Sequence, residues 1–461
     1  MNFETDPQRH FVAKAKKPIP ISALTKMQFA KIGGQLSEAH KNWASSQGFT
    51  GKAGQICQLP DANGKLEKVL YGLGGGKDEN PFAHGVLAHQ LPAGTYAFDG
   101  KVKEPVQRDL GWAMGAYSFD RYRKSKTKIP KLVAGGGDEA RRLAQAVYIA
   151  RDLVNIPAND MGPDALEKAF RKIASYHKAK TSTVKGEQLL KMNFPMVHAV
   201  GRASDQAPRI LDMVWGNAKH PKITLVGKGV TFDTGGLNIK PGNSMALMKK
   251  DMGGAANVLG LAHLIMDAKL PVRLRVIVGA VENSISGNAF RPGDVLPSRK
   301  GMSVEIGNTD AEGRLVLGDC LALADEESPE LLIDMATLTG AARVALGPDL
   351  PPYYTHDDAF ARKLDKAALS VHDPLWRMPL WAPYQSMLAS KIADVNHITA
   401  GGFGGSITAA LFLSRFVENA KTWSHFDVFA WVPIPKPWAP VGGEAQGIRA
   451  LYEVIKSTYK S

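Results

Sequence analysis

The feature that most constrains the fold of this chain is an alternation of short apolar runs and longer helical patterns between residues 223 and 335. Runs rich in apolar and β-branched residues predict strands at 223–226, 272–281 and 331–335. The spacing of apolar residues predicts helices at 254–266 and 315–324. Strands that alternate with helices in this way form a mostly parallel sheet covered by helices. We therefore expect an α/β fold with ligand sites at the carboxyl ends of its strands.

The 461 residues suggest two or three domains. The stretch Val133-Ala134-Gly135-Gly136-Gly137 marks a break, and apolar residues at helical spacing follow it up to Val154. Before the break, residues 68–73 have the pattern of a strand. The expected organisation is a small N-terminal α/β domain (1–137), a linker helix (138–155) and a larger domain (156–461) built on a central, mostly parallel or mixed sheet flanked by helices.

The composition of the chain indicates the cellular compartment. No run of about 18 uncharged apolar residues occurs, so we expect no transmembrane helix. The first residues lack the pattern of a secretory signal. The two cysteines, Cys57 and Cys320, form no CxxC pair, which favours a reducing compartment. We expect a cytoplasmic protein.

The net charge of +13 is uneven, because residues 1–137 hold 20 Lys or Arg against 11 Asp or Glu. The densest basic cluster comprises Arg121, Arg123, Lys124, Lys126, Lys128 and Lys131. Such a cluster can bind nucleic acid through its charge, or it can be an ordinary solvated face. The sequence leaves both interpretations open.

Four acidic residues lie where predicted strands end or predicted helices begin: Asp233, Asp251, Asp310 and Glu312. If they converge, four carboxylates without cations repel one another and resist ionisation. Two divalent cations balance the charge, and oxygen ligands suit Mg²⁺, Mn²⁺ and Zn²⁺. No HExxH motif or Cys/His cluster offers another metal site.

Each of these residues also has an ordinary structural interpretation when taken alone. Asp310 or Thr309 fits a helix cap, and Lys228 fits a solvated lysine. Gly253-Gly254 fits close packing of the backbone. Spacing alone therefore does not establish a metal site.

Together, the segments resemble the leucyl aminopeptidase family of two-metal exopeptidases. The resemblance rests on GKGVTFDTGG (227–236) with the following Lys240, DMGGAA (251–256) and NTDAEGR (308–314), in this order. The intervals between lysines and acids are those of the family: 5, 7, 11 and 59 residues from Lys228 through Asp233, Lys240 and Asp251 to Asp310. Further matches occur at 118–122, 154–161, 334–340, 404–410 and 423–427.

The resemblance implies a role for each matching residue. Asp233 and Glu312 are expected to bridge two metal ions, with Lys228 and Asp251 completing one site and Asp310 the other. Ligation through Lys228 requires the neutral amine, so the cations must lower its pKa.

Two further charged residues are expected to act in catalysis. Lys240 is expected to stay charged and stabilise the oxyanion of the intermediate. The resemblance implies that Arg314 anchors a bicarbonate ion, which in this family serves as general base, and this role would account for the lack of a spare His or Glu in these motifs. The resemblance also implies short peptides with a free N-terminus as substrates, and a homohexamer.

Substrate-binding positions implied by the resemblance are Met248, Thr337, Leu338, Gly340 and Phe429. After Asp427 the family usually has Ile-Ala-Gly, whereas this chain has Val428-Phe429-Ala430. We therefore expect Phe429 to fill or reshape the pocket for the first substrate side chain, so the resemblance does not fix which N-terminal residue this chain prefers. The alternate prolines between Pro433 and Pro440 predict an extended loop, either a pocket wall or a subunit contact.

Two other classes of function remain. A DNA-binding accessory protein would use the basic N-terminal region. A dinucleotide-dependent oxidoreductase would need GxGxxG directly after a strand, and we find no good example.

Overall fold

The computed structural model describes residues 5–32, 36–75, 80–100, 104–123 and 129–459. The chain forms two compact units. The N-terminal unit comprises Met1–Tyr148 and Ile434–Val441, and the C-terminal unit comprises Ile149–Pro433 and Gly442–Ser461. The boundary falls within helix α5 (Gly137–Asn155), which covers the helix predicted after the glycine stretch.

The N-terminal unit contains a six-stranded sheet of order β1-β6-β5-β2-β4-β3. Its neighbouring strands are parallel except β3 and β4. The strand predicted at 68–73 is confirmed as part of β4. The strands are β1 (Phe11–Val12), β2 (Ile19–Thr25), β3 (Ile56–Pro60), β4 (Leu66–Gly74), β5 (Thr95–Phe98) and β6 (Lys131–Val133). The accompanying helices are α1 (Lys26–Ile32), α2 (Glu38–Ser46), α3 (Leu87–Gln90) and α4 (Pro105–Ala116).

The segment Ile434–Val441 packs within the N-terminal unit, where the rings of Trp438 and Phe82 lie 6.4 Å apart. No residue of this segment lines the cavity described below. The lining of that cavity thus gives no support to the pocket-wall interpretation of the proline-rich loop, and the subunit-contact interpretation stays a prediction. The expected extended conformation is not kept throughout the segment, because Lys436 and Ala439 pair across a tight turn through backbone hydrogen bonds of 2.8 and 3.1 Å.

The C-terminal unit is built on an eight-stranded sheet of order β15-β14-β17-β13-β9-β10-β8-β7. Its four central strands, β17, β13, β9 and β10, are parallel, whereas β8, β7 and β14 run antiparallel to a neighbour. The predicted mostly parallel or mixed sheet is confirmed. The strands are β7 (Lys180–Lys185), β8 (Arg209–Trp215), β9 (Lys222–Asp233), β10 (Arg273–Asn283), β13 (Leu331–Ala336), β14 (Pro352–Tyr354), β15 (Trp376–Arg377) and β17 (Trp423–Asp427).

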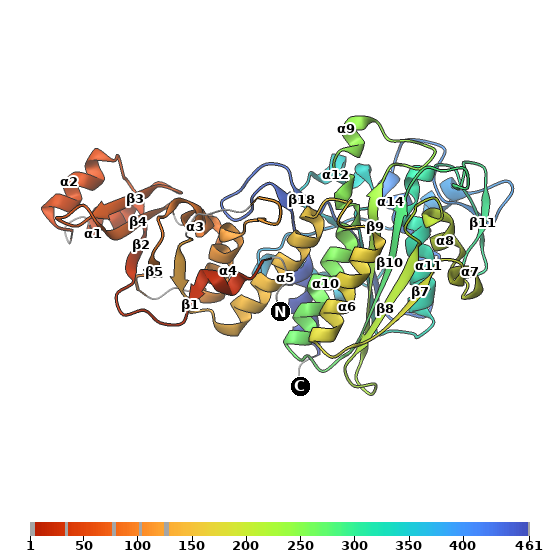
Figure 1. Cartoon of the computed structure of the whole chain (residues 1–461), viewed down its shortest axis with the longest axis horizontal. Helices are drawn as coiled ribbons and strands as arrows, with labels where there is room; N and C mark the ends of the chain where they lie inside the picture. Colours follow the sequence, from red (N-terminus) through yellow and green to blue (C-terminus); the bar gives the residue numbers. More distant parts are fainter. Residues whose placement is uncertain (1–4, 33–35, 76–79, 101–103, 124–128, 460–461) are drawn as a thin grey trace. The chain divides into compact units, whose positions relative to one another are not determined.

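Helices cover both faces of this sheet (Figure 1). On one face lie α6 (Pro163–Tyr176), α10 (Gly253–Asp267) and α15 (Ile448–Thr458). On the other lie α8 (Pro195–Gly201), α11 (Gly313–Asp325) and α14 (Gly405–Ser414). The helices predicted at 254–266 and 315–324 are confirmed as α10 and α11. Both are almost entirely buried, which agrees with their apolar sequences.

Shorter elements complete the C-terminal unit. They are α7 (Gln188–Lys191), α9 (Gly242–Met245), α12 (Gly340–Leu346), α13 (Asp358–Ser370), the 3₁₀ turns η4 (Met248–Met252), η5 (Thr309–Ala311) and η6 (Ala382–Leu388), and the strands β11 (Val295–Pro297), β12 (Ser303–Glu305), β16 (Val395–Asn396), β18 (Trp431–Val432) and β19 (Gly442–Gly443). Because the four central strands are parallel, their carboxyl ends share one edge of the sheet. That edge carries Asn283, Asp233 and Asp427 as the last residues of β10, β9 and β17.

Candidate active site

Strand β9 supplies both Lys228 and Asp233, although five residues separate them. Side chains alternate along a strand, so this odd spacing would place the two on opposite faces. The register shifts near the end of the strand: Val230 pairs with Val281, whereas Asp233 pairs with Asn283. The extra residue reverses the alternation, and both side chains reach the same acidic cluster.

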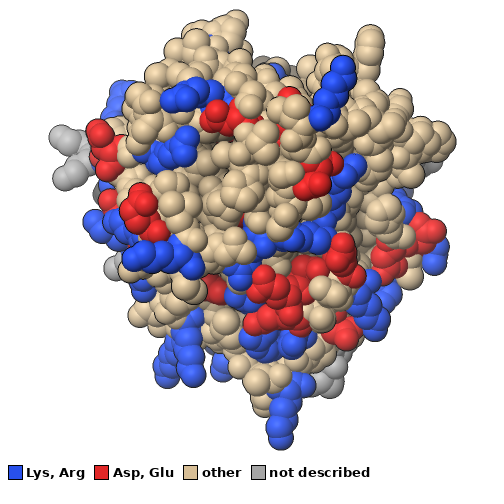
Figure 2. Space-filling view, turned by 90° about the vertical axis from the view of Figure 1, so that its right-hand side faces the viewer, with Lys and Arg blue, Asp and Glu red and all other residues tan. Residues whose placement is uncertain are grey.

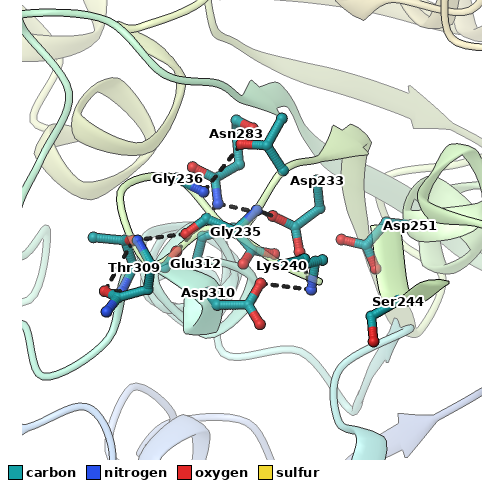
Figure 3. A network of polar contacts seen from close by, with 12 residues as sticks. Asp233, Gly235, Gly236, Lys240, Ser244, Asp251, Asn283, Thr309, Asp310 and Glu312 are labelled. Carbon is teal, nitrogen blue, oxygen red and sulfur yellow. Dashed lines mark hydrogen bonds and ion pairs between the residues drawn. The ribbon is translucent and has the colours of Figure 1, made fainter. Parts of the chain in front are cut away.

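The other acids come from the turns that precede α10 and α11. Asp251 lies in η4, Asp310 lies in η5, and Glu312 stands directly before α11. Asn308 caps η5 by accepting a hydrogen bond from the backbone N–H of Asp310. The helix-cap interpretation of Asp310 is therefore wrong, and its carboxylate points to the cluster instead (Figure 3).

Two lysines lie among these acids. The Nζ atom of Lys228 is 2.7 Å from Asp251 Oδ2 and 2.9 Å from Glu312 Oε1. Lys228 is only 3% exposed, so the solvated-lysine interpretation is wrong. The Nζ atom of Lys240 is 2.8 Å from Asp233 Oδ2 and 2.5 Å from Asp310 Oδ1 (Figure 3).

The carboxylates are too close to one another to ionise easily. Ligand oxygens of Asp233, Asp310 and Glu312 lie within 4.8 Å of one another. Burial and the charge of Asp233 raise the pKa of Glu312 to about 8 and that of Asp310 to about 6. Glu312 Oε2 is buried without a hydrogen-bond partner in the described part of the chain. An acidic cluster with an unsatisfied buried oxygen fits a site for cations.

The pKa values of the two lysines are raised as well, which for a lysine favours the charged form. Burial alone would lower both pKa values. The negative charges of Asp251 and Glu312 raise the pKa of Lys228 above its ordinary range, and the charge of Asp233 does the same for Lys240. Both lysines are therefore charged in the protein without metal, and they neutralise part of the acidic charge.

Asn283 orients the carboxylate of Asp233, a role that the sequence did not reveal. Its Nδ2 atom donates to Asp233 Oδ1 over 2.8 Å and to the carbonyl oxygen of Thr309 over 3.1 Å. The backbone N–H of Gly235 donates to the same Asp233 oxygen over 2.8 Å. Asn283 therefore links the end of β9 to the turn that carries Asp310.

Two glycines of the motifs leave room for these contacts. A Cβ atom on Gly313 would lie 2.5 Å from Lys228 Cε and 2.7 Å from its Nζ. Gly235 has a φ of +86°, which disfavours other residues, and its added Cβ would lie 3.0 Å from Asp310 Oδ1. Both positions therefore require glycine for spatial reasons.

Arg314 lies behind the cluster in the first turn of α11. Its Nη1 atom donates to the carbonyl oxygen of His397 over 2.7 Å, and its buried Nε has no partner among the described residues. Burial lowers the pKa of Arg314 to about 10, so it stays charged at neutral pH. Arg314 does not line the cavity described next.

His397 was also missed by the sequence reasoning. Gly307 N donates to its Nδ1 over 3.2 Å, and its Nε2 lies 2.9 Å from the carbonyl oxygen of Asn308. Burial lowers its pKa to about 3, so the ring is neutral. Because both ring nitrogens are bonded to backbone, His397 positions the turn before Asp310.

A cavity of about 470 Å³ opens beside the acidic cluster. Its lining includes Lys228, Asp233, Lys240, Asp251 and Asp310 and all five predicted substrate-binding residues: Met248, Thr337, Leu338, Gly340 and Phe429. The structure therefore brings the predicted ligands and pocket residues to one place.

Residues after β13 connect this cavity to the acids. Thr337 donates from Oγ1 to Asp251 Oδ1 over 2.7 Å. The backbone N–H groups of Leu338 and Thr339 donate to Asp427 Oδ1 over 2.9 and 3.1 Å. These bonds fix the loop between β13 and α12 along one side of the cavity.

The cavity also contains two cations that the sequence reasoning did not single out, Lys250 and Arg343. Both lie over the ring of Phe429. Burial lowers the pKa of Lys250 to about 8. In the sequence, Lys250 is one of two lysines before Asp251 and carries no signal of its own.

The basic cluster is only partly described. Arg121, Arg123 and Lys131 belong to the described residues, whereas 124–128 lie outside them. On the face shown in Figure 2, acidic and basic side chains are intermixed rather than separated into single-sign patches. Within the described residues, no helix is long and apolar enough to cross a membrane.

The fold and the site define a peptidase enzyme. Residues 148–452 match the description "Cytosol aminopeptidase family, catalytic domain", and residues 19–134 match "M17 aminopeptidase, N-terminal domain". The chain belongs to the cytosol aminopeptidase family, as its motifs predicted.

Relatives cover most of the chain. A protein of Rhizobium meliloti named "Probable cytosol aminopeptidase" is 38% identical over 450 residues, which is 90% of each chain. A protein of the same name from Roseiflexus castenholzii is 39% identical over 367 residues, 75% of each chain.

Solved structures agree with these matches. The cytosol aminopeptidase of Coxiella burnetii is 42% identical, with a TM-score of 0.93 over 97% of this chain and 98% of that one. The structure named bottromycin maturation enzyme BotP in complex with Mn is 30% identical, with a TM-score of 0.86 over 97% of this chain and 100% of that one.

Proposed function

We propose that this protein is a metal-dependent aminopeptidase that hydrolyses the N-terminal amide bond of short peptides. The observation that carries the proposal is the approach of Asp233, Asp310 and Glu312 within 4.8 Å, with Glu312 Oε2 buried and without a hydrogen-bond partner among the described residues. Such a group of oxygens is suited to divalent cations. The BotP structure, which was determined with Mn, supports a related site here.

Five residues would hold two ions, Mn²⁺ or Zn²⁺ and alternatively Mg²⁺. Asp233 and Glu312 would lie between the ions, Lys228 and Asp251 would complete one position, and Asp310 the other. Lys228 would have to lose its proton to take part. When bound, two such ions polarise a scissile carbonyl and acidify a water molecule.

Lys240 is the residue suited to stabilise negative charge on the substrate. It lines the cavity, and Asp233 and Asp310 fix its Nζ atom from one side. Its raised pKa keeps it protonated. A fixed ammonium group beside the scissile carbonyl would stabilise the oxyanion as it develops.

Arg314 is proposed to anchor bicarbonate as the general base. Its Nε lacks a partner in the described part of the chain, so an anion could accept a hydrogen bond from it. His397 cannot take the role of base, since both of its ring nitrogens are engaged with backbone. Replacement of Arg314 by Met should abolish any bicarbonate stimulation of hydrolysis.

The oligomeric state and the cellular location of the protein belong to the same proposal. We expect a homohexamer, which mass measurement in solution would test. The two free buried cysteines, and the word "cytosol" in the names of the relatives, support a cytoplasmic location.

The deciding experiment is hydrolysis of aminoacyl amides and dipeptides with Mn²⁺, Zn²⁺ or a chelator added. Cleavage should need metal and a free α-amine, so N-acetylated peptides should be left intact. Activity that survives complete removal of metal contradicts the proposal.

A second candidate is a DNA-binding accessory role, favoured by the basic N-terminal region. Salt-dependent retention on duplex DNA, lost when the basic residues of 121–131 are neutralised, would support it. Salt-independent binding, or none, would remove it.

A further inference from the structure

Two cationic side chains lie over the ring of Phe429, the residue that differs from the family pattern expected at this position. The Nζ atom of Lys250 lies 4.7 Å from the ring centroid of Phe429, and the Cζ atom of Arg343 lies 5.2 Å from it. All three residues line the cavity beside the acidic cluster. They therefore form one local feature of the pocket.

Lys250 is enclosed but has no acidic partner. It is 5% exposed, yet within the described residues its ammonium group makes no hydrogen bond or ion pair. The other two cavity lysines, Lys228 and Lys240, each contact two carboxylates. A buried charge is normally paired, and an aromatic face compensates only part of the lost hydration.

The nearest acids of the cavity are already engaged. Asp427 accepts hydrogen bonds from Leu338 N, Thr339 N and Thr339 Oγ1. Asp251 is paired with Lys228 through Oδ2 and accepts from Thr337 through Oδ1. Neither of these two acids thus offers Lys250 a free carboxylate, and the described part of the chain forms no ion pair with it.

We propose that the cavity selects peptides whose first residue is Asp or Glu, with Lys250 and Arg343 as specificity-determining residues that bind the side-chain carboxylate. The inference rests on the proposed aminopeptidase function and names its substrate class. An acidic side chain gives the enclosed ammonium its missing partner, whereas the neutral amide of Gln or Asn does not. Arg343 is exposed, so solvent screens its contribution more strongly.

The test compares substrates of equal shape and different charge. With the full-length protein loaded with Mn²⁺ at pH 7.5, kcat/KM is measured for Glu-, Gln-, Asp-, Asn- and Leu-p-nitroanilide. The variants are K250M and R343Q, and the matched control is K366M, which removes an exposed lysine of α13 outside the cavity. Inhibition of the wild-type protein by free L-glutamate and L-glutamine gives a readout that needs no variant.

We expect the wild-type protein to favour Glu over Gln at least tenfold and to be inhibited more strongly by glutamate. K250M should lower the Glu/Gln ratio at least tenfold, R343Q should lower it less, and K366M should preserve both this ratio and the rate of Leu cleavage. If K250M does not fold, the proposal is decided by the Glu/Gln ratio of R343Q and by the inhibition constants of glutamate and glutamine for the wild-type protein.

The experiment distinguishes failure of the proposed specificity from failure of the proposed aminopeptidase function. Cleavage of the Leu substrate without discrimination between Glu and Gln, or an unchanged ratio in K250M, overturns the specificity and leaves the aminopeptidase function standing. Absence of cleavage on every substrate with every metal overturns the function itself.

Discussion

The Nδ2 atom of Asn283 donates a 2.8 Å hydrogen bond to Oδ1 of Asp233, so the last residue of β10 fixes the last residue of β9. The same nitrogen contacts the carbonyl oxygen of Thr309. Asn283 thereby holds two acid-bearing segments in register, and this relationship leads to the first prediction.

Replacing Asn283 by Ala should weaken Mn²⁺ binding about 10- to 100-fold, the usual effect of removing a residue that orients a ligand. Asp233 loses one of its donors, and the Thr309 carbonyl loses its side-chain contact. Titration calorimetry of the metal-free protein with Mn²⁺ measures the change. Asn217→Ala, in an exposed turn, serves as control. Equal affinities of both variants would contradict the role.

Replacing Glu312 by Gln should stabilise the metal-free protein and abolish its stabilisation by metal. The folded pKa of Glu312 is raised to about 8 from 4.5, so between these values the folded state holds a proton that the unfolded chain has released. Stability without metal therefore falls as pH rises through this window. Urea unfolding with chelator at pH 5 and pH 8 checks the sign. An equal pH dependence in E312Q would refute this account.

Replacing Gly313 by Ala should lower kcat at least 100-fold with little loss of stability. The added Cβ would displace the ammonium end of Lys228, which is enclosed and held by two carboxylates. Steady-state kinetics with Mn²⁺ and the thermal midpoint are the measurements. The control is Gly287→Ala, where a Cβ meets nothing within 4 Å. Full activity of G313A would show that Lys228 can move freely.

Replacing Phe429 by Ala should change which N-terminal residue is released fastest. The substitution removes the ring next to Lys250 and Arg343 and enlarges the cavity that it lines. Relative kcat/KM values over a panel of aminoacyl substrates are the readout. Phe403→Ala, at a position 85% exposed, is the control. Unchanged relative rates would remove Phe429 from the determinants of specificity.

Much of the fold and the acidic cluster could be predicted from the sequence, because each pattern that indicates them lies within one short stretch of residues. Asp233 ends an apolar run, and Asp310 and Glu312 precede a helical pattern, so parallel topology brings them together. The antiparallel strands β7 and β8, at one end of the sheet, were not predicted. No segment between 180 and 215 was interpreted as a strand.

The missed residues act through contacts that are distant in sequence. Asn283 is one polar residue at the end of a strand, and its function depends on β9 lying beside β10. Lys250 differs from neighbouring Lys249 only in its surroundings: Lys249 donates to the carbonyl oxygen of Asn155, whereas Lys250 is enclosed in the cavity. No local pattern distinguishes two such lysines.

The register shift in β9 makes the length of one short segment critical for this enzyme. The four residues of β9 from Val230 to Asp233 span the same distance as the three residues of β10 from Val281 to Asn283. A variant that gained one more residue between Val230 and Asp233 could keep the strand pairing, but its aspartate would point to the opposite face of the sheet. Insertions and deletions in the exposed loops should therefore be tolerated far better than a single insertion here, which would leave the sheet folded but turn this aspartate away from the other acids.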